Sequence, residues 1–214
     1  MRSSESTPGD AWPHDMQITV DDRPRVLMEL LWAREAYDLH PAGDELPPPL
    51  EDAPRHATAI TVSEAVRADW QREWPSIWGA AVEHAGHESD FGAFTELQKT
   101  ADGSSERAHL LHLMVGPNWR DEVGDDAFDD DSYREWSRRG SNAHNAAYPT
   151  ALHDNPEYRD LDALIPAWRA GLTKIVTIPC RGEFARKIST KALLATHVTR
   201  EISDSYRRAL ACFA

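Results

Sequence analysis

Four basic side chains in a turn and in the stretch after it are the first candidates for binding chemistry in this sequence. The turn at residues 179–183 comes directly after the apolar run 174–178, and loops at strand ends carry binding sites more often than core elements do. Guanidinium and ammonium groups bind phosphate and carboxylate through charge-assisted hydrogen bonds. A glycine-rich phosphate loop is absent, because Gly182 stands alone. We therefore expect an anion or an acidic partner to bind at Arg181, Arg186, Lys187 and Lys191.

Two pairs of histidines have a spacing that suits a metal ion. His84 with His87, and His109 with His112, lie three residues apart, which places both imidazoles on one face of a helix. A catalytic zinc site needs a further ligand and a general base, and neither pair encloses the glutamate of the common zinc-protease helix. On a strand, the same spacing points the two rings to opposite faces. The pairs are metal candidates only in a helical setting.

Three of the eight tryptophans share one flank of a predicted helix. Trp70, Trp74 and Trp78 follow one another at intervals of four residues, so their rings lie above one another. Such a flank can stack against bases, sugars or a partner helix. The alternative is a large aromatic core, and Pro75 would tilt one part of the flank against the rest.

An acidic stretch over residues 121–131 offers carboxylates to a divalent cation. Its spacing does not match the EF-hand loop, which needs a glycine at position 6 and a glutamate at position 12. The alternatives are a solvated surface and a docking surface for a basic partner. No Gly-x-Ser-x-Gly elbow occurs either, so no motif names a reaction and the question of whether the chain is an enzyme stays open.

Charge is distributed unevenly along the 214 residues, whose net charge is −13. Nine basic and three acidic side chains in residues 168–214 leave that segment with six positive charges, so the remainder carries nineteen negative ones. This asymmetry predicts either an anion-binding face or a basic end that packs on the acidic body. The overall charge disfavours generic binding to nucleic acid or to anionic lipid.

Periodicity and cap residues predict the elements that must position these groups. Pro24 near the start and His40-Pro41 at the end delimit a first helix. A capping box at Thr61 and Glu64 opens a second, which Pro75 kinks or divides. Further helices are predicted over about residues 90–101, around 133–136, and over 156–171 and 203–213. Strands are predicted over residues 107–115, 174–178 and 192–198.

These elements predict an α+β fold. A mainly helical N-terminal two-thirds packs on a small β-sheet, and the C-terminal helix lies across that sheet. Residues 1–17 read as a polar N-terminal tail, and residues 18–214 as a single domain with a Pro-rich linker near 43–55. Neither the residue types nor their spacing specifies a cofactor.

The leading functional hypothesis is a non-catalytic intracellular protein that engages a protein partner through charged surfaces and the aromatic flank. The alternatives are a metal-assisted hydrolase that uses a histidine pair with a nearby carboxylate, and a nucleic-acid-associated protein that uses the basic C-terminal quarter. Two cysteines and the absence of a signal-like or membrane-spanning apolar run predict a cytoplasmic location without membrane contact. Nineteen arginines against four lysines hint at a GC-rich, bacterial genome.

Overall fold

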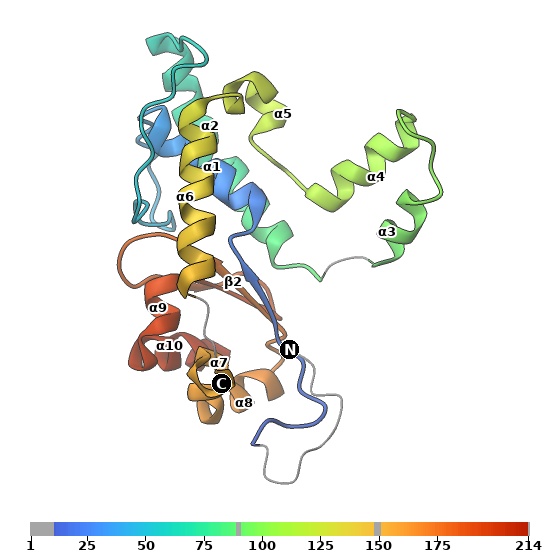
Figure 1. Ribbon diagram of the computed structural model, residues 1–214, viewed down its shortest axis with the longest axis vertical. Coiled ribbons are helices and arrows are strands. Elements are labelled where there is room, and N and C mark those ends of the chain that lie inside the picture. Colours follow the sequence, from blue (N-terminus) through green and yellow to red (C-terminus); the bar gives the residue numbers. More distant parts are fainter. Residues whose placement is uncertain (1–10, 89–90, 148–150, 214) are drawn as a thin grey trace.

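A four-stranded mixed sheet lies at the centre of the computed structural model, which describes residues 11–88, 91–147 and 151–213 (Figure 1). The strands are arranged in the order β1-β2-β4-β3. Three of them are parallel, namely β1 (Thr19–Asp22), β2 (Lys174–Ile178) and β4 (Ala192–Thr196), and β3 (Ala185–Lys187) runs antiparallel to β4. The carboxyl ends of three strands therefore meet at one edge of the sheet.

Both faces of the sheet are covered, which explains why β2 and β4 are apolar at almost every position. Along β2, Ile175 packs with the helices at the C-terminal end of the chain, whereas Val176 and Ile178 pack into the core of the long helical segment. All five residues of β4 are buried. Because successive side chains of a strand point to opposite faces, β2 contributes to two separate hydrophobic cores, one on each side of the sheet.

The helical lobe, which we define as residues 25–147, lies between β1 and β2 in the sequence. Its elements are α1 (Arg25–Ala36), α2 (Glu64–Ala85), α3 (Phe91–Leu97), α4 (Ser105–Val115), α5 (Arg120–Val123), the 3₁₀ turn η1 (Asp125–Phe128) and α6 (Asp131–Ala147). Figure 1 shows α3 and α4 extending away from the other helices, while α6 runs from the far end of this lobe back to the sheet.

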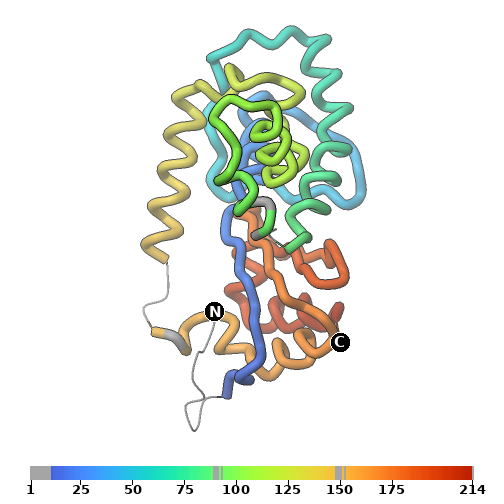
Figure 2. The backbone as a smooth tube through the Cα atoms, turned by 90° about the vertical axis from the view of Figure 1, so that its right-hand side faces the viewer, coloured from blue at the N-terminus to red at the C-terminus, as the bar shows by residue number. Residues whose placement is uncertain are grey.

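The second layer of helices covers the opposite face of the sheet (Figure 2). It consists of η2 (Leu152–Asp154), α7 (Pro156–Arg159), α8 (Leu161–Arg169), α9 (His197–Glu201), α10 (Ser203–Leu210) and η3 (Ala211–Phe213). Trp12 and Met16 are buried in the same core, so part of the predicted polar tail packs on the sheet. Residues 1–10 of that tail lie outside the described residues.

The α+β class is confirmed, with a mainly helical N-terminal two-thirds, a small sheet and a C-terminal helix. The predicted strand over residues 107–115 is wrong, because these residues form α4. Ser104 caps this helix by accepting a hydrogen bond from the backbone N–H of Arg107 at 3.1 Å, and no α4 side chain is buried. The apolar run resembled a core strand in the sequence, but it lies on a projecting helix.

Smaller differences concern short elements. α2 continues through Pro75, which lies between the buried Trp74 and Trp78, and its N-cap is Ser63 rather than Thr61. The strand predicted over residues 192–198 ends at Thr196, where α9 begins. β1 and β3 were not predicted, since runs of four and three residues carry little periodicity.

Within the described part of the chain, no helix has the length and apolar character needed to cross a bilayer.

Candidate functional site

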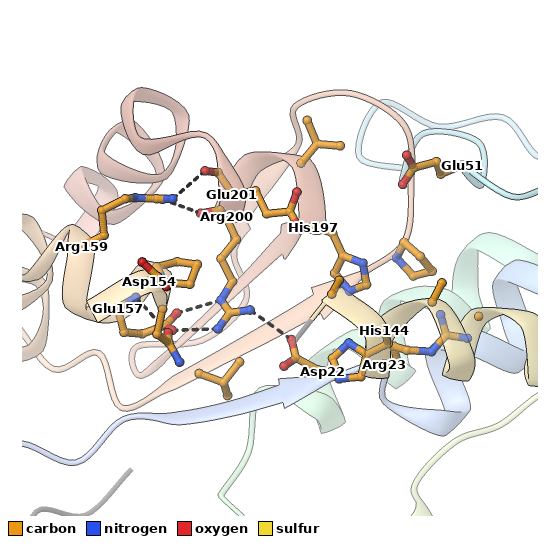
Figure 3. A pocket seen from close by; sticks show the side chains of 18 of the residues that line it. Asp22, Arg23, Glu51, His144, Asp154, Glu157, Arg159, His197, Arg200 and Glu201 are labelled. Atoms are coloured by element: carbon orange, nitrogen blue, oxygen red, sulfur yellow. Dashed lines mark hydrogen bonds and ion pairs between the residues drawn. The ribbon is translucent and has the colours of Figure 1, made fainter. Parts of the chain in front are cut away.

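A cavity of about 970 Å³ opens at the carboxyl ends of the parallel strands (Figure 3). It is lined by Asp22 at the end of β1, Pro179 just after β2 and His197 just after β4, and is closed by residues of α6 and α7. Open sheets with parallel strands bind ligands at this edge, because the loops and helix starts that follow the strands converge there. The volume is in the range typical of small-molecule sites.

Arg200 ties together three elements beneath this cavity. Its guanidinium makes two hydrogen bonds to the Glu157 carboxylate, at 2.8 and 2.7 Å, and lies 3.5 Å from an oxygen of Asp22 (Figure 3). The hydroxyl of Tyr206 donates to Glu157 at 2.9 Å, and that of Thr177 donates to Asp22 at 2.6 Å. Both carboxylates are therefore held as structural anions on α7 and β1.

Arg23 is a half-buried cation in the lining of the cavity. It lies between β1 and α1 with a φ of 64°, a backbone conformation that costs a side chain with a Cβ about 1–2 kcal/mol. Its guanidinium packs against Gly140 of α6 and lies 5.8 Å from the centre of the Trp136 ring. Among the described residues it has no hydrogen bond or ion pair. Burial lowers the pKa of Arg23, and Asp52 only partly opposes this effect.

Asp52, whose charge acts on Arg23, does not pair with it. Asp52 is occupied by Arg139, which donates to its two carboxylate oxygens at 3.0 and 3.1 Å. The exposed carboxylates that also line the cavity are Glu51, Asp154 and Glu201, where water screens their charge. Among the residues that the structure describes, Arg23 is thus a half-buried cation without an acidic partner at hydrogen-bonding distance.

His197 is the second unusual group in the wall. Its Nε2 is buried and has no hydrogen-bond partner among the described residues, and its ring centre lies 6.3 Å from that of His144 on α6. Burial lowers the pKa of His197 to about 4; Arg23, His144 and Arg200 act in the same direction, and Asp22 opposes them. The imidazole is neutral at neutral pH, so it can donate one hydrogen bond and accept another.

This burial predicts a pH-dependent stability that belongs to one residue. The unfolded chain takes up the His197 proton near pH 6.5 and the folded chain only near pH 4, so the stabilising contribution is complete above pH 6.5 and is lost as the pH falls toward 4. When the pH is lowered from 6.5 to 4, the unfolding free energy of the unaltered protein should decrease. In His197→Gln we expect this decrease to be smaller by about 1–3 kcal/mol.

Urea denaturation at the two pH values checks this expectation. His109→Gln, at an exposed position of α4, is the control and should follow the unaltered protein. Equal losses in His197→Gln and the unaltered protein would show that His197 is not buried in its neutral form.

The basic residues singled out in the sequence lie elsewhere, and none of them lines the cavity. Arg186 is paired with Glu45 at 2.9 Å and Lys191 with Glu88 at 2.9 Å. Lys187 lies 4.2 Å from the centre of the Phe213 ring, and Arg181 is exposed. Arg186, Lys191 and Arg200 therefore pair with acidic residues outside the basic C-terminal segment.

The tryptophan flank lies inside the helical lobe. Trp74 and Trp78 are fully buried and stack with their ring centres 5.2 Å apart, and the half-buried Trp70 makes edge contacts with Tyr37 and Trp119. Two of the three rings therefore present no surface to a partner.

The two histidine pairs form no metal site with a third ligand among the described residues. His84 and His87 have ring centres 6.2 Å apart, and Nε2 of His84 lies 3.0 Å from the carbonyl oxygen of Leu113. His109 and His112 are exposed on α4. Within the described ranges, no three His, Cys, Asp or Glu side chains are placed to hold a metal ion.

The acidic stretch over residues 121–131 is partly structural. Burial alone would raise the pKa of Asp130, but hydrogen bonds from the backbone N–H groups of Thr58, Ser132 and Ala59 outweigh it and lower the pKa. The carboxylate therefore fixes the loop before α2 to the start of α6.

The residues that matter most at the cavity have a weak signal in the sequence. Arg23, Gly140 and the pair His197 and Arg200 come from three separated segments, and the region around Arg23 was interpreted only as a helix start. The one signal in the sequence is an arginine that directly precedes Pro24, and an analysis of helix caps does not single it out.

Comparison with family models, with curated proteins and with solved structures finds no match to this chain.

Proposed function

We propose that this chain binds a small anionic organic molecule in the cavity, with the Arg23 guanidinium as its anchor. The observation that carries the proposal is the half-buried guanidinium of Arg23, which lacks an ion pair or hydrogen bond among the described residues at the strand-end edge. A charge removed from water without a partner raises the free energy of the folded state. A ligand with a phosphate or carboxylate group would remove that cost, since a planar guanidinium binds either group through paired hydrogen bonds.

Backbone strain at the same residue supports the proposal independently. Left-handed conformations of residues other than glycine persist where the surrounding structure enforces them, and they gather at binding and active sites. At Arg23 the strained turn directs a long cationic side chain across the cavity edge to α6, where Gly140 leaves room for it.

Anion binding, which the sequence predicts at Arg181 and its basic neighbours, is proposed here for Arg23 in the cavity instead. Engagement of a protein partner through Arg181 and its neighbours remains a prediction from the sequence. A small-molecule ligand is favoured because two of those four cations already have acidic partners, whereas Arg23 has none among the described residues.

Thermal unfolding with inorganic phosphate tests the proposal. Once phosphate exceeds its dissociation constant about tenfold, it should stabilise the unaltered protein by about 1.4 kcal/mol, or about 3–6 °C in Tm, relative to sodium chloride of equal ionic strength. Arg23→Gln should abolish this difference. Arg72→Gln, which removes an exposed arginine of α2, is the matched control and should keep it. Equal stabilisation of Arg23→Gln and the unaltered protein would overturn the proposal.

A further inference from the structure

A second cavity adjoins the first at Arg23. It has a volume of about 440 Å³ and shares Asp22, Arg23 and His144 with the larger one. These three residues come from the end of β1, from the turn after it and from α6. The anchoring cation therefore lies where two cavities meet rather than at the closed end of one.

The two cavities differ in chemistry. The larger one has an apolar wall that includes Trp12, Ile18 and Val20. Besides the shared residues and Arg25 and Met28 of α1, the smaller one is lined by hydrogen-bonding side chains on α6, namely Tyr133, Ser137, Ser141 and Asn145. An apolar or aromatic group fits the first wall, and a group rich in hydroxyls fits the second.

From this arrangement we infer the class of the ligand: an organic phosphate whose charged group is internal, a phosphodiester or a diphosphate with an organic group on each side. The inference rests on the proposed function, because it takes Arg23 as the anion anchor. A terminal phosphate at Arg23 would fill the larger cavity and leave the smaller one without ligand. An internal phosphate places its charge at Arg23, where the cavities meet, and one substituent in each cavity.

Two related probes separate an internal from a terminal diphosphate. ADP carries the more negative charge, whereas ADP-ribose has the same adenosine and an internal diphosphate. We expect ADP-ribose to bind at least tenfold more tightly than ADP in calorimetric titrations. If charge alone decided affinity, ADP would bind at least as tightly.

A variant confined to the smaller cavity completes the test. Ser141→Leu fills that cavity from α6, and it should reduce the affinity for ADP-ribose about tenfold while leaving that for ADP unchanged. Ser76→Leu, which adds the same bulk at an exposed position of α2 outside both cavities, should bind both probes as the unaltered protein does. Equal affinities for the two probes, or equal losses for both in Ser141→Leu, would overturn the inference.

The outcome also distinguishes this inference from the proposed function. Phosphate stabilisation that depends on Arg23, without tighter binding of ADP-ribose, rejects the internal phosphate alone. If phosphate does not stabilise the unaltered protein, or stabilises Arg23→Gln to the same extent, both the proposed function and the internal phosphate are rejected.

Discussion

Arg200→Met is expected to lower the free energy of unfolding by about 3–5 kcal/mol, because it leaves the Glu157 carboxylate buried without its cation. The side chains of Glu157 and Arg200 are 3% and 15% exposed. Among the described residues, the Glu157 carboxylate would keep only the Tyr206 hydroxyl as a partner, and the link from α9 to Asp22 of β1 would be lost. Urea denaturation followed by circular dichroism measures the change.

Two further variants decide whether the buried charge is the cause. Arg208→Met breaks an exposed pair with Glu183 and should cost no more than about 1 kcal/mol. Replacing both Arg200 and Glu157 by methionine should destabilise the fold less than Arg200→Met alone, since no unpaired charge remains. A double variant as unstable as the single one would assign the loss to packing instead.

Gly140→Ala is expected to make the protein more stable while it removes phosphate binding. A Cβ at this position of α6 would lie 2.7 Å from Cζ of Arg23, so the guanidinium must leave its place at the meeting point of the cavities. Alanine favours the interior of a helix over glycine by about 1 kcal/mol. We therefore expect the unfolding free energy to rise by about 1 kcal/mol and the phosphate-induced increase in Tm to disappear.

The matched control is Gly79→Ala in the middle of α2, where an added Cβ would meet no atom within 4 Å. It should gain similar stability and keep the full response to phosphate. Retention of that response in Gly140→Ala would show that the position of the Arg23 guanidinium is irrelevant to binding.

Most of the long elements could be predicted from the sequence because their patterns are local. Helix α1 follows from Pro24 and the helical spacing of its apolar residues, and β2 follows from a β-branched run that ends at Pro179. Helix α4 was missed because its apolar residues face solvent: Leu111, Leu113 and Val115 are all more than 40% exposed. An apolar run predicts burial only when another element covers it.

The site could not be predicted in the same way. Its cation, its neutral imidazole and its structural ion pair come from segments that only the tertiary fold brings together. The basic residues near position 186 formed the more visible pattern, yet Arg186 and Lys191 neutralise acids of the same chain. A local excess of charge does not reveal whether its partners lie elsewhere in the molecule.

The pairing of β1 with β2 has a consequence for synthesis on the ribosome. About 150 residues separate Asp22 from Lys174, so β1 has no neighbour in the sheet until the whole helical lobe has been translated. At about 5–20 residues per second, this interval lasts roughly 8–30 s. During that time Met16 and Ile18 lack the apolar cover that the later helices provide. The nascent chain therefore offers chaperones an exposed N-terminal segment long after the adjacent helices have begun to fold.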